Sequence, residues 1–185
     1  MIKLVGVEKT LGKQAVLRGV DLTIPTGKLT TIIGRSGEGK SVLLKHIIGL
    51  MQPDRGEVWI DGTNIARLKG QALNEVRKKF AMLFQGAALF DSMTVFENVA
   101  FPLREKLRLK GDVVTRRVEE KLDQVGLKGM GHKFPAELSG GMRKRAGLAR
   151  AIALDPPLVY FDEPSAGLDP IMAAGLDRLI LDMRK

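Results

Sequence analysis

Between positions 29 and 41 the sequence reads Leu29-Thr30-Thr31-Ile32-Ile33-Gly34-Arg35-Ser36-Gly37-Glu38-Gly39-Lys40-Ser41, an apolar run followed by a glycine-rich one. The first five residues are almost all β-branched, which predicts a buried strand over residues 29–33. Residues 41–50 then carry apolar side chains at helical spacing. The order strand, glycine-rich loop and helix is typical of an α/β fold.

The glycine-rich loop matches the pattern G-x-x-x-x-G-K-[ST] at its fixed spacing. Its glycines let backbone N–H groups converge on phosphate oxygens, and the following helix adds the positive end of its dipole. Lys40 would reach the β- and γ-phosphates of a nucleotide, and the hydroxyl of Ser41 would ligate Mg²⁺. The sequence thus predicts a phosphate-binding loop formed by Gly34, Arg35, Ser36, Gly37, Glu38, Gly39, Lys40 and Ser41.

The rest of the chain is rich in strands at first and then in helices. Apolar or alternating runs predict strands at residues 2–7, 16–24, 57–60, 80–84 and 158–161. Helices are predicted at residues 68–79, in most of 94–153, and from Pro170 onward. The helical section suits a subdomain that is inserted between the strands of an α/β core.

Two adjacent carboxylates, Asp162 and Glu163, follow the apolar run 158–161 directly. Charge at the end of a buried strand is costly unless it is paired or bound to a metal. In this interpretation Asp162 holds Mg²⁺, often through water, and Glu163 orients and deprotonates the water that attacks a γ-phosphate. The alternative is a pair of surface carboxylates at a turn.

Ser139, Gly140 and Gly141 precede an apolar helix predicted over residues 142–154. This is a second helix N-terminus suited to binding phosphate, and its alternative is an ordinary N-cap with a flexible entry. One nucleotide on a single chain has no use for two such termini.

Composition limits the classes of protein. The chain has 185 residues, no cysteine and a formal net charge of +9. This length suits one domain, and the lack of cysteine excludes disulfides, zinc–thiolate sites and thiol catalysis. The charge favours anionic partners, namely nucleotides, nucleic acid or a lipid surface. Since no apolar run approaches the roughly 20 residues of a membrane span and the first ten residues lack a signal peptide, we expect neither a secreted nor an integral membrane protein.

With the phosphate loop, Leu138-Ser139-Gly140-Gly141-Met142, Asp162-Glu163-Pro164 and Ser165-Ala166-Gly167-Leu168-Asp169 in this order, the chain resembles an ABC transporter ATPase subunit over its whole length. The resemblance implies a P-loop NTPase fold. The fold implied by this resemblance has a RecA-like core (residues 1–90 and 155–185), an N-terminal antiparallel β subdomain and a helical subdomain at about 91–154. It also implies bound ATP and Mg²⁺, and a dimer with a second copy, because the signature at Ser139, Gly140 and Gly141 would complete the partner's site.

The resemblance assigns roles to two further residues. Gln85 falls where the family has a Gln that touches Mg²⁺ and relays its state to the helical subdomain. Asp169 matches a loop that crosses the dimer and senses the opposite site. The family's switch His would follow the Pro170 helix, and neither His46 nor His132 matches it. We therefore expect a domain that lacks its C-terminal strands and is weakly active or inactive in isolation, with both histidines structural or exposed.

Residues 82–91 (MLFQGAALFD), residues 95–105 (VFENVAFPLRE) and Met142 resemble the Mla-type phospholipid transport subfamily. That resemblance implies ATP-driven phospholipid transport between envelope membranes, from the cytoplasmic face of the inner membrane. Its partners would be membrane permease subunits and an MCE-type lipid-binding protein, with no nucleic acid. The alternatives are the ATPase of another importer, for amino acids or ions, which would share every catalytic residue, and an ABC ATPase that acts on DNA or ribosomes, suggested by the charge.

Overall fold

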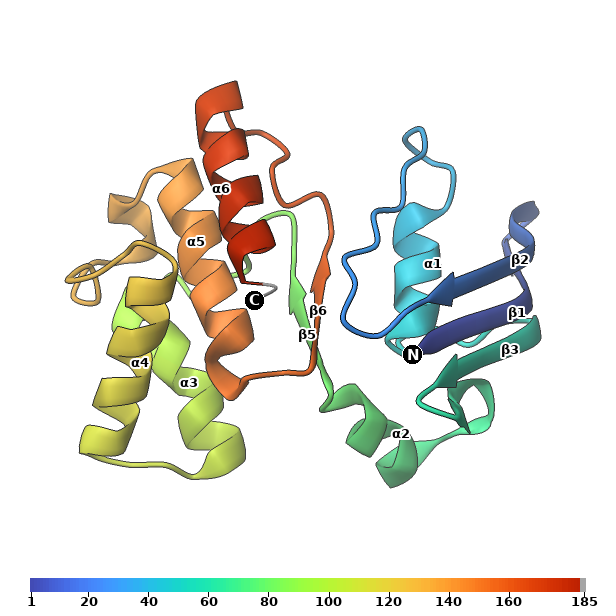
Figure 1. Cartoon of the computed structure of the whole chain (residues 1–185), viewed down its shortest axis with the longest axis horizontal. Coiled ribbons are helices and arrows are strands. Elements are labelled where there is room, and N and C mark those ends of the chain that lie inside the picture. The colour runs from blue at the N-terminus through green and yellow to red at the C-terminus, as the bar shows by residue number, and fades with distance from the viewer. Residues whose placement is uncertain (184–185) are drawn as a thin grey trace. The chain divides into compact units, whose positions relative to one another are not determined.

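The computed structural model describes residues 1–183, which form two compact units, residues 1–79 and residues 80–183 (Figure 1). The first unit carries an antiparallel sheet and the second carries most of the helices. The finer division into a core and a helical subdomain stays a prediction, since β6 (Leu158–Phe161) and α6 (Pro170–Asp182) belong to the second unit.

A four-stranded sheet in the order β2-β1-β3-β4 forms the body of the first unit. Its strands are β1 (Ile2–Leu11), β2 (Gln14–Ile24), β3 (Arg55–Ile60) and β4 (Thr63–Asn64), and its helices are α1 (Lys40–Ile47), the 3-10 turn Ile65–Arg67 and α2 (Gly70–Arg77). All neighbouring strands are antiparallel, which agrees with the expected N-terminal β subdomain.

The register of the sheet follows from alternating burial in β1. Ile2 and Leu4 are buried while Lys3 between them is exposed, because successive side chains of a strand point to opposite faces. Leu4 lies opposite Leu22 of β2 and Val58 of β3, so apolar residues from three strands share one face. At Gly56 the strands approach so closely that a Cβ atom would lie 2.4 Å from the backbone oxygen of Gly6, and only glycine fits there.

The prediction of a strand at residues 29–33 is wrong, because residues 28–35 have no regular secondary structure. Within the part of the chain that the structure describes, the two sheets contain only β1 to β6, and no strand pairs with this segment. A strand exists only through hydrogen bonds to a neighbour, so a suitable composition is not sufficient. The side chain of Ile33 is 90% exposed as a result.

His46 of α1 is buried in the first unit, and its Nδ1 lies 2.7 Å from the backbone oxygen of Val42. Burial lowers the pKa of the His46 imidazole below its ordinary value. The unfolded chain therefore binds a proton at this residue more readily than the folded chain, and stability should fall as the pH drops below about 6.5. Asp54, Asp61 and Glu97 also have lowered pKa values and stay ionised near pH 5.5, so they do not imitate this effect.

We expect the melting temperature to be lower at about pH 5.5 than at about pH 7.5, and the difference to shrink in His46→Gln. The fluorescence of Trp59, the only tryptophan, reports unfolding of the same unit from its half-buried place on β3. His132→Gln is the matched control, since His132 is exposed, and it should keep the full pH dependence. An equal pH dependence in all three proteins would contradict the assignment to His46.

The second unit is built around three helices and a pair of parallel strands. Its elements are β5 (Phe80–Leu83), α3 (Val95–Leu107), α4 (Asp112–Gln124), the 3-10 turn Pro135–Glu137, α5 (Gly140–Ala151), the 3-10 turn Ile152–Leu154, β6 and α6. One continuous hydrophobic core includes Val99, Leu103, Val118 and Leu148, and the helices of α3, α4 and α5 contact one another around it. These helices confirm the helical character predicted for residues 94–153.

A capping box and a buried amide fix the start of α3. The hydroxyl of Thr94 accepts from the Glu97 N–H, while the Glu97 carboxylate accepts from the Thr94 N–H at 2.7 Å. These bonds hold the pKa of Glu97 below its ordinary value. The Asn98 side chain is fully buried and bonds both the N–H and the carbonyl of Phe90, so the loop before the helix has a defined shape.

No helix within residues 1–183 combines the length and the apolar character that a membrane crossing requires.

Candidate functional site

The glycine-rich loop, residues 34–41, lies in the first unit and closes on itself through charged side chains. Lys40 Nζ donates to the backbone oxygens of Gly34 at 2.8 Å and Arg35 at 2.9 Å. The Glu38 carboxylate accepts from the Arg35 N–H at 2.7 Å. The ammonium group of Lys40 is therefore held against the first two residues of the loop, close to any anion that binds there.

Helix α1 begins at Lys40, so the last two residues of the loop, Lys40 and Ser41, form its first turn, and a helix follows the glycines as the sequence predicts. Its first turn contains no acidic residue and its N-cap, Gly39, supplies no side-chain bond. Gly39 has φ 92° and packs so closely on β2 that a Cβ would lie 2.7 Å from Val16 Cγ1. The glycine thus anchors the loop to the sheet of its own unit, and the positive end of the α1 dipole lies at the end of the loop.

In the second unit, Gln85 and the acidic pair follow two neighbouring parallel strands. Phe161 of β6 is paired with Leu83 of β5, and the Asp162 N–H extends the ladder by donating to the Leu83 oxygen at 3.1 Å. Gln85 comes two residues after Leu83, so Gln85 and Asp162 follow their strands at the same, carboxyl edge of the sheet. Ligand-binding residues in α/β folds gather at such ends.

Glu163 adopts an unusual backbone conformation, with φ 47°, and its side chain is exposed. A left-handed φ is unfavourable for a residue with a side chain and persists only where the surroundings enforce it. The Ala166 N–H donates to the Glu163 oxygen at 3.1 Å and closes the turn that contains this residue. The carboxylate is therefore presented to solvent by a constrained turn.

Within residues 1–183, no three side chains of His, Asp or Glu lie together in a group able to hold a metal ion. The predicted metal ligands are Ser41 in the first unit and Gln85 and Asp162 in the second. A hydroxyl, an amide oxygen and a carboxylate are hard donors of the kind that Mg²⁺ prefers. Each of these donors by itself suits an ion that takes most of its ligands from phosphates and water, and their joint role in one site stays a prediction.

The predicted signature forms the start of α5, with Ser139 as its N-cap. The Ser139 hydroxyl accepts from the Met142 N–H at 3.3 Å. Cβ atoms on the next two glycines would lie 3.6 Å from Leu168 Cδ2 and 2.1 Å from Met172 Cε. This end of α5 therefore packs on the loop after the acidic pair and on the start of α6.

Asp169 caps α6: its carboxylate accepts from the N–H groups of Ile171 and Met172, both at 3.0 Å. The side chain therefore has a local structural role in addition to the role across a dimer that its motif implies, and the latter stays a prediction.

Lys144 is a residue that the sequence interpretation missed. It lies on α5 one turn after Gly141, is 7% exposed, and donates from Nζ to the backbone oxygens of Pro164, at 2.6 Å, and Ala166. The signal was its helical spacing, because Gly141, Lys144 and Leu148 fall on one buried face where a lysine needs partners.

Further along α5, a second loop packs against the same helix. A Cβ on Gly147 would lie 2.9 Å from the Ala87 oxygen, in the loop that follows Gln85. The Arg150 guanidinium lies 5.4 Å from the centroid of the Phe90 ring. Helix α5 thus contacts the segments after both strands of the parallel pair.

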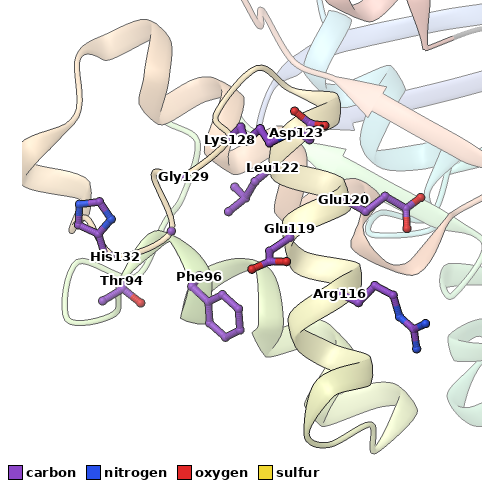
Figure 2. A pocket seen from close by; sticks show the side chains of 11 residues that line it. Thr94, Phe96, Arg116, Glu119, Glu120, Leu122, Asp123, Lys128, Gly129 and His132 are labelled. Atoms are coloured by element: carbon purple, nitrogen blue, oxygen red, sulfur yellow. Dashed lines mark ion pairs between the residues drawn. The ribbon is translucent and has the colours of Figure 1, made fainter.

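An open groove of about 830 Å³ lies between the start of α3, helix α4 and residues 128–132 (Figure 2). Its lining combines both signs of charge, with Arg116 and Lys128 beside Glu119, Glu120 and Asp123. His132 lines it and is exposed, whereas His46 is buried, which agrees with the expectation that both histidines are structural or exposed. None of the predicted site residues lines this groove.

The candidate site residues are divided between the two units. The phosphate loop belongs to the first unit, and Gln85, Ser139, Gly140, Gly141, Asp162, Glu163 and Asp169 belong to the second. Within the second unit, strand pairing and α5 link all of these segments.

Comparison with known proteins identifies the family of this chain and several relatives. The family model described as ABC transporter matches residues 17–166. The chain is 50% identical over 182 residues to the probable ribonucleotide transport ATP-binding protein mkl of Mycobacterium tuberculosis. This alignment covers 98% of this chain and 51% of that protein. It is 48% identical over 177 residues to the intermembrane phospholipid transport system ATP-binding protein MlaF of Escherichia coli K12, with 96% of this chain and 66% of that protein covered.

Among solved structures, a dimeric ATP-binding cassette in a post-hydrolysis state with ADP and Pi matches with a TM-score of 0.88 and 33% identity. The match covers 100% of this chain and 83% of that one. The cbiO1 protein of Clostridium perfringens, part of the ABC transporter complex cbiONQ, matches with a TM-score of 0.90 and 27% identity, over 99% of this chain and 73% of that one. The chain therefore spans about half to two thirds of the curated relatives and more of the solved cassettes.

Proposed function

The chain belongs to the ABC transporter family, and on this basis we propose that it is the ATP-binding and hydrolysing part of a transporter's cytoplasmic motor. The observation that carries the proposal is the carboxyl end of the β5–β6 pair. There Gln85 and the acidic pair leave adjacent strands, in a chain that also has a complete phosphate loop. Fold similarity to a cassette that was solved with ADP and Pi supports the same activity.

Each residue has a distinct part in the proposed reaction. The loop N–H groups and Lys40 would bind the β- and γ-phosphates, and Ser41, Gln85 and Asp162 would hold Mg²⁺, which neutralises charge on the phosphates when bound. The Glu163 carboxylate would accept a proton from the attacking water and aim it at the γ-phosphorus. Its exposure on a constrained turn leaves it free to meet a substrate.

We further propose that the active form contains two copies. Ser139, Gly140 and Gly141 begin a 12-residue helix whose N-terminal N–H groups suit a phosphate. In a head-to-tail pair these residues would complete the nucleotide site of the other copy, and Asp169 would lie in the loop that crosses between them. The dimeric state of a similar cassette supports this arrangement. ATP binding would close the dimer, and hydrolysis would reopen it.

For the cargo we propose phospholipid, moved between envelope membranes by a permease pair and an MCE-type lipid-binding protein. Similarity to a phospholipid transport protein over 96% of this chain supports this choice. The motor would then sit at the cytoplasmic face of the inner membrane, peripheral to it through the permease. The name of the mycobacterial relative refers instead to ribonucleotides, which keeps a different cargo as the second candidate.

The test is to purify the full-length protein with its membrane partners in mild detergent, to measure its ATPase activity, and to identify bound lipids and proteins by mass spectrometry. A permease and a phospholipid-loaded MCE protein would support the proposal. A solute-binding protein for another cargo would support the second candidate. Recovery with DNA or ribosomes would contradict both.

A further inference from the structure

We propose that Lys144 is a positioning residue for hydrolysis, which holds the turn that presents Glu163 and ties it to the helix of the signature. The inference rests on the proposed ATPase function. It assigns to a side chain outside the recognised motifs the task of fixing the geometry of the general base.

The contacts of Lys144 are unusual for a lysine. Its side chain is 7% exposed, and burial lowers the pKa of its ammonium group. Within residues 1–183 it forms no ion pair with a carboxylate, and its Nζ donates to the Pro164 oxygen at 2.6 Å and to the Ala166 oxygen. A buried cation is retained only where bonds compensate for lost hydration, and here two backbone carbonyls do so.

The two carbonyls that Lys144 contacts lie in the turn that contains Glu163. Pro164 follows Glu163 directly, and the Ala166 N–H donates to the Glu163 oxygen at 3.1 Å. Lys144 therefore holds both sides of Ser165 and closes the same turn from outside. Because Glu163 has the left-handed φ of 47°, its conformation needs such support to persist.

Lys144 itself lies on helix α5, which begins at the signature residues. Gly140 and Gly141, one turn before Lys144, pack on Leu168 of the loop and on Met172 of α6, so α5 contacts both the loop and the helix that follows it. Because Lys144 is bonded to the carbonyls of Pro164 and Ala166, a rotation of α5 would displace both carbonyls. The position of Glu163 would thus depend on the helix that carries Ser139.

The experiment compares Lys144→Met and Lys144→Gln with wild type in the full-length protein, with its membrane partners present. Methionine fills a similar volume and donates no hydrogen bond, whereas the glutamine amide donates two without a charge. We expect kcat for ATP to fall roughly tenfold or more in Lys144→Met, because misplacement of a catalytic group by about 1 Å has effects of this size or larger. Lys144→Gln should recover part of the loss. KM should change less than about twofold, since the phosphate loop is untouched.

Lys128→Met is the matched control, because Lys128 loses the same charge from a side chain that is 82% exposed in the same unit. It should hydrolyse ATP like wild type. Wild-type kcat in Lys144→Met would overturn the proposal, and so would equal losses in Lys144→Gln and Lys144→Met, because a purely volumetric role does not distinguish them.

Amide hydrogen exchange separates this inference from the proposed function. In Lys144→Met the amides of Ala166 and Leu168, which are bonded within the loop, should exchange faster than in wild type, while the β1 amides do not change. An inactive wild type would refute the ATPase function, yet the exchange rates would still decide whether Lys144 holds the loop. Unchanged exchange would overturn the inference in an active protein as well.

Discussion

Replacing Glu163 by Gln is expected to reduce ATP turnover by roughly 10² to 10⁴-fold while nucleotide binding is retained. The amide has nearly the same shape as the carboxylate but cannot take a proton from the attacking water. Because the Glu163 side chain is exposed, the substitution removes no packing, and the backbone at φ 47° suits either residue about equally. The loss should therefore appear in kcat and not in stability.

The measurement is steady-state ATPase activity together with equilibrium binding of ATP and size-exclusion chromatography of the full-length variant. With ATP present, Glu163→Gln should elute as a stable dimer, because closure without hydrolysis has no route to reopening. Glu119→Gln is the control, since Glu119 is an exposed carboxylate on α4, and it should behave like wild type. Equal turnover in Glu163→Gln and wild type would remove Glu163 from the role of general base.

Replacing Lys40 by Ala should act one step earlier, on binding itself. The ammonium group is already held at the loop by two carbonyls, at 2.8 and 2.9 Å, so little conformational freedom is lost when phosphates arrive. Hydrogen bonds to charged groups contribute about 1.5–3 kcal/mol each. The dissociation constant for ATP should thus rise on the order of 10- to 100-fold.

Titration calorimetry with ATP and Mg²⁺ checks this expectation. Lys45→Ala is the matched control, because Lys45 is an exposed lysine on the same helix α1 and lies outside the loop. It should bind ATP like wild type. If Lys40→Ala bound ATP as tightly as Lys45→Ala, the phosphate role of the loop would be refuted. The contrast with Glu163→Gln is diagnostic, since one variant should lose affinity and the other turnover.

The local elements could be predicted because their signals are local. The helix after the phosphate loop, the strand Leu158–Phe161 and the helix that begins at Pro170 all lie where apolar spacing, glycine or proline indicated them. Ser139 as an N-cap followed from its residue type alone. Local sequence signals thus predicted these elements, whereas the roles of the site residues on them stay predictions.

Pairing could not be predicted in the same way. Residues 29–33 have the composition of a buried strand, yet no strand in residues 1–183 pairs with them and Ile33 is 90% exposed. Strand composition describes a surface that suits a neighbour, and it carries no information about which neighbour is present. The same limit explains why Lys144 was missed, since its partners are backbone carbonyls about 20 residues further along the chain.

Helix α5 has a mechanical consequence. Its 12 residues span about 18 Å at 1.5 Å per residue. Gly140, at its first position, contacts Leu168 in the loop after Glu163, and Gly147, at its eighth, contacts Ala87 in the loop after Gln85. A helix this short does not bend appreciably, so the distance between its contact with Leu168 and its contact with Ala87 stays fixed. We therefore expect a displacement of one loop to move the other, and the lack of a side chain at Gly147 permits the close contact with Ala87.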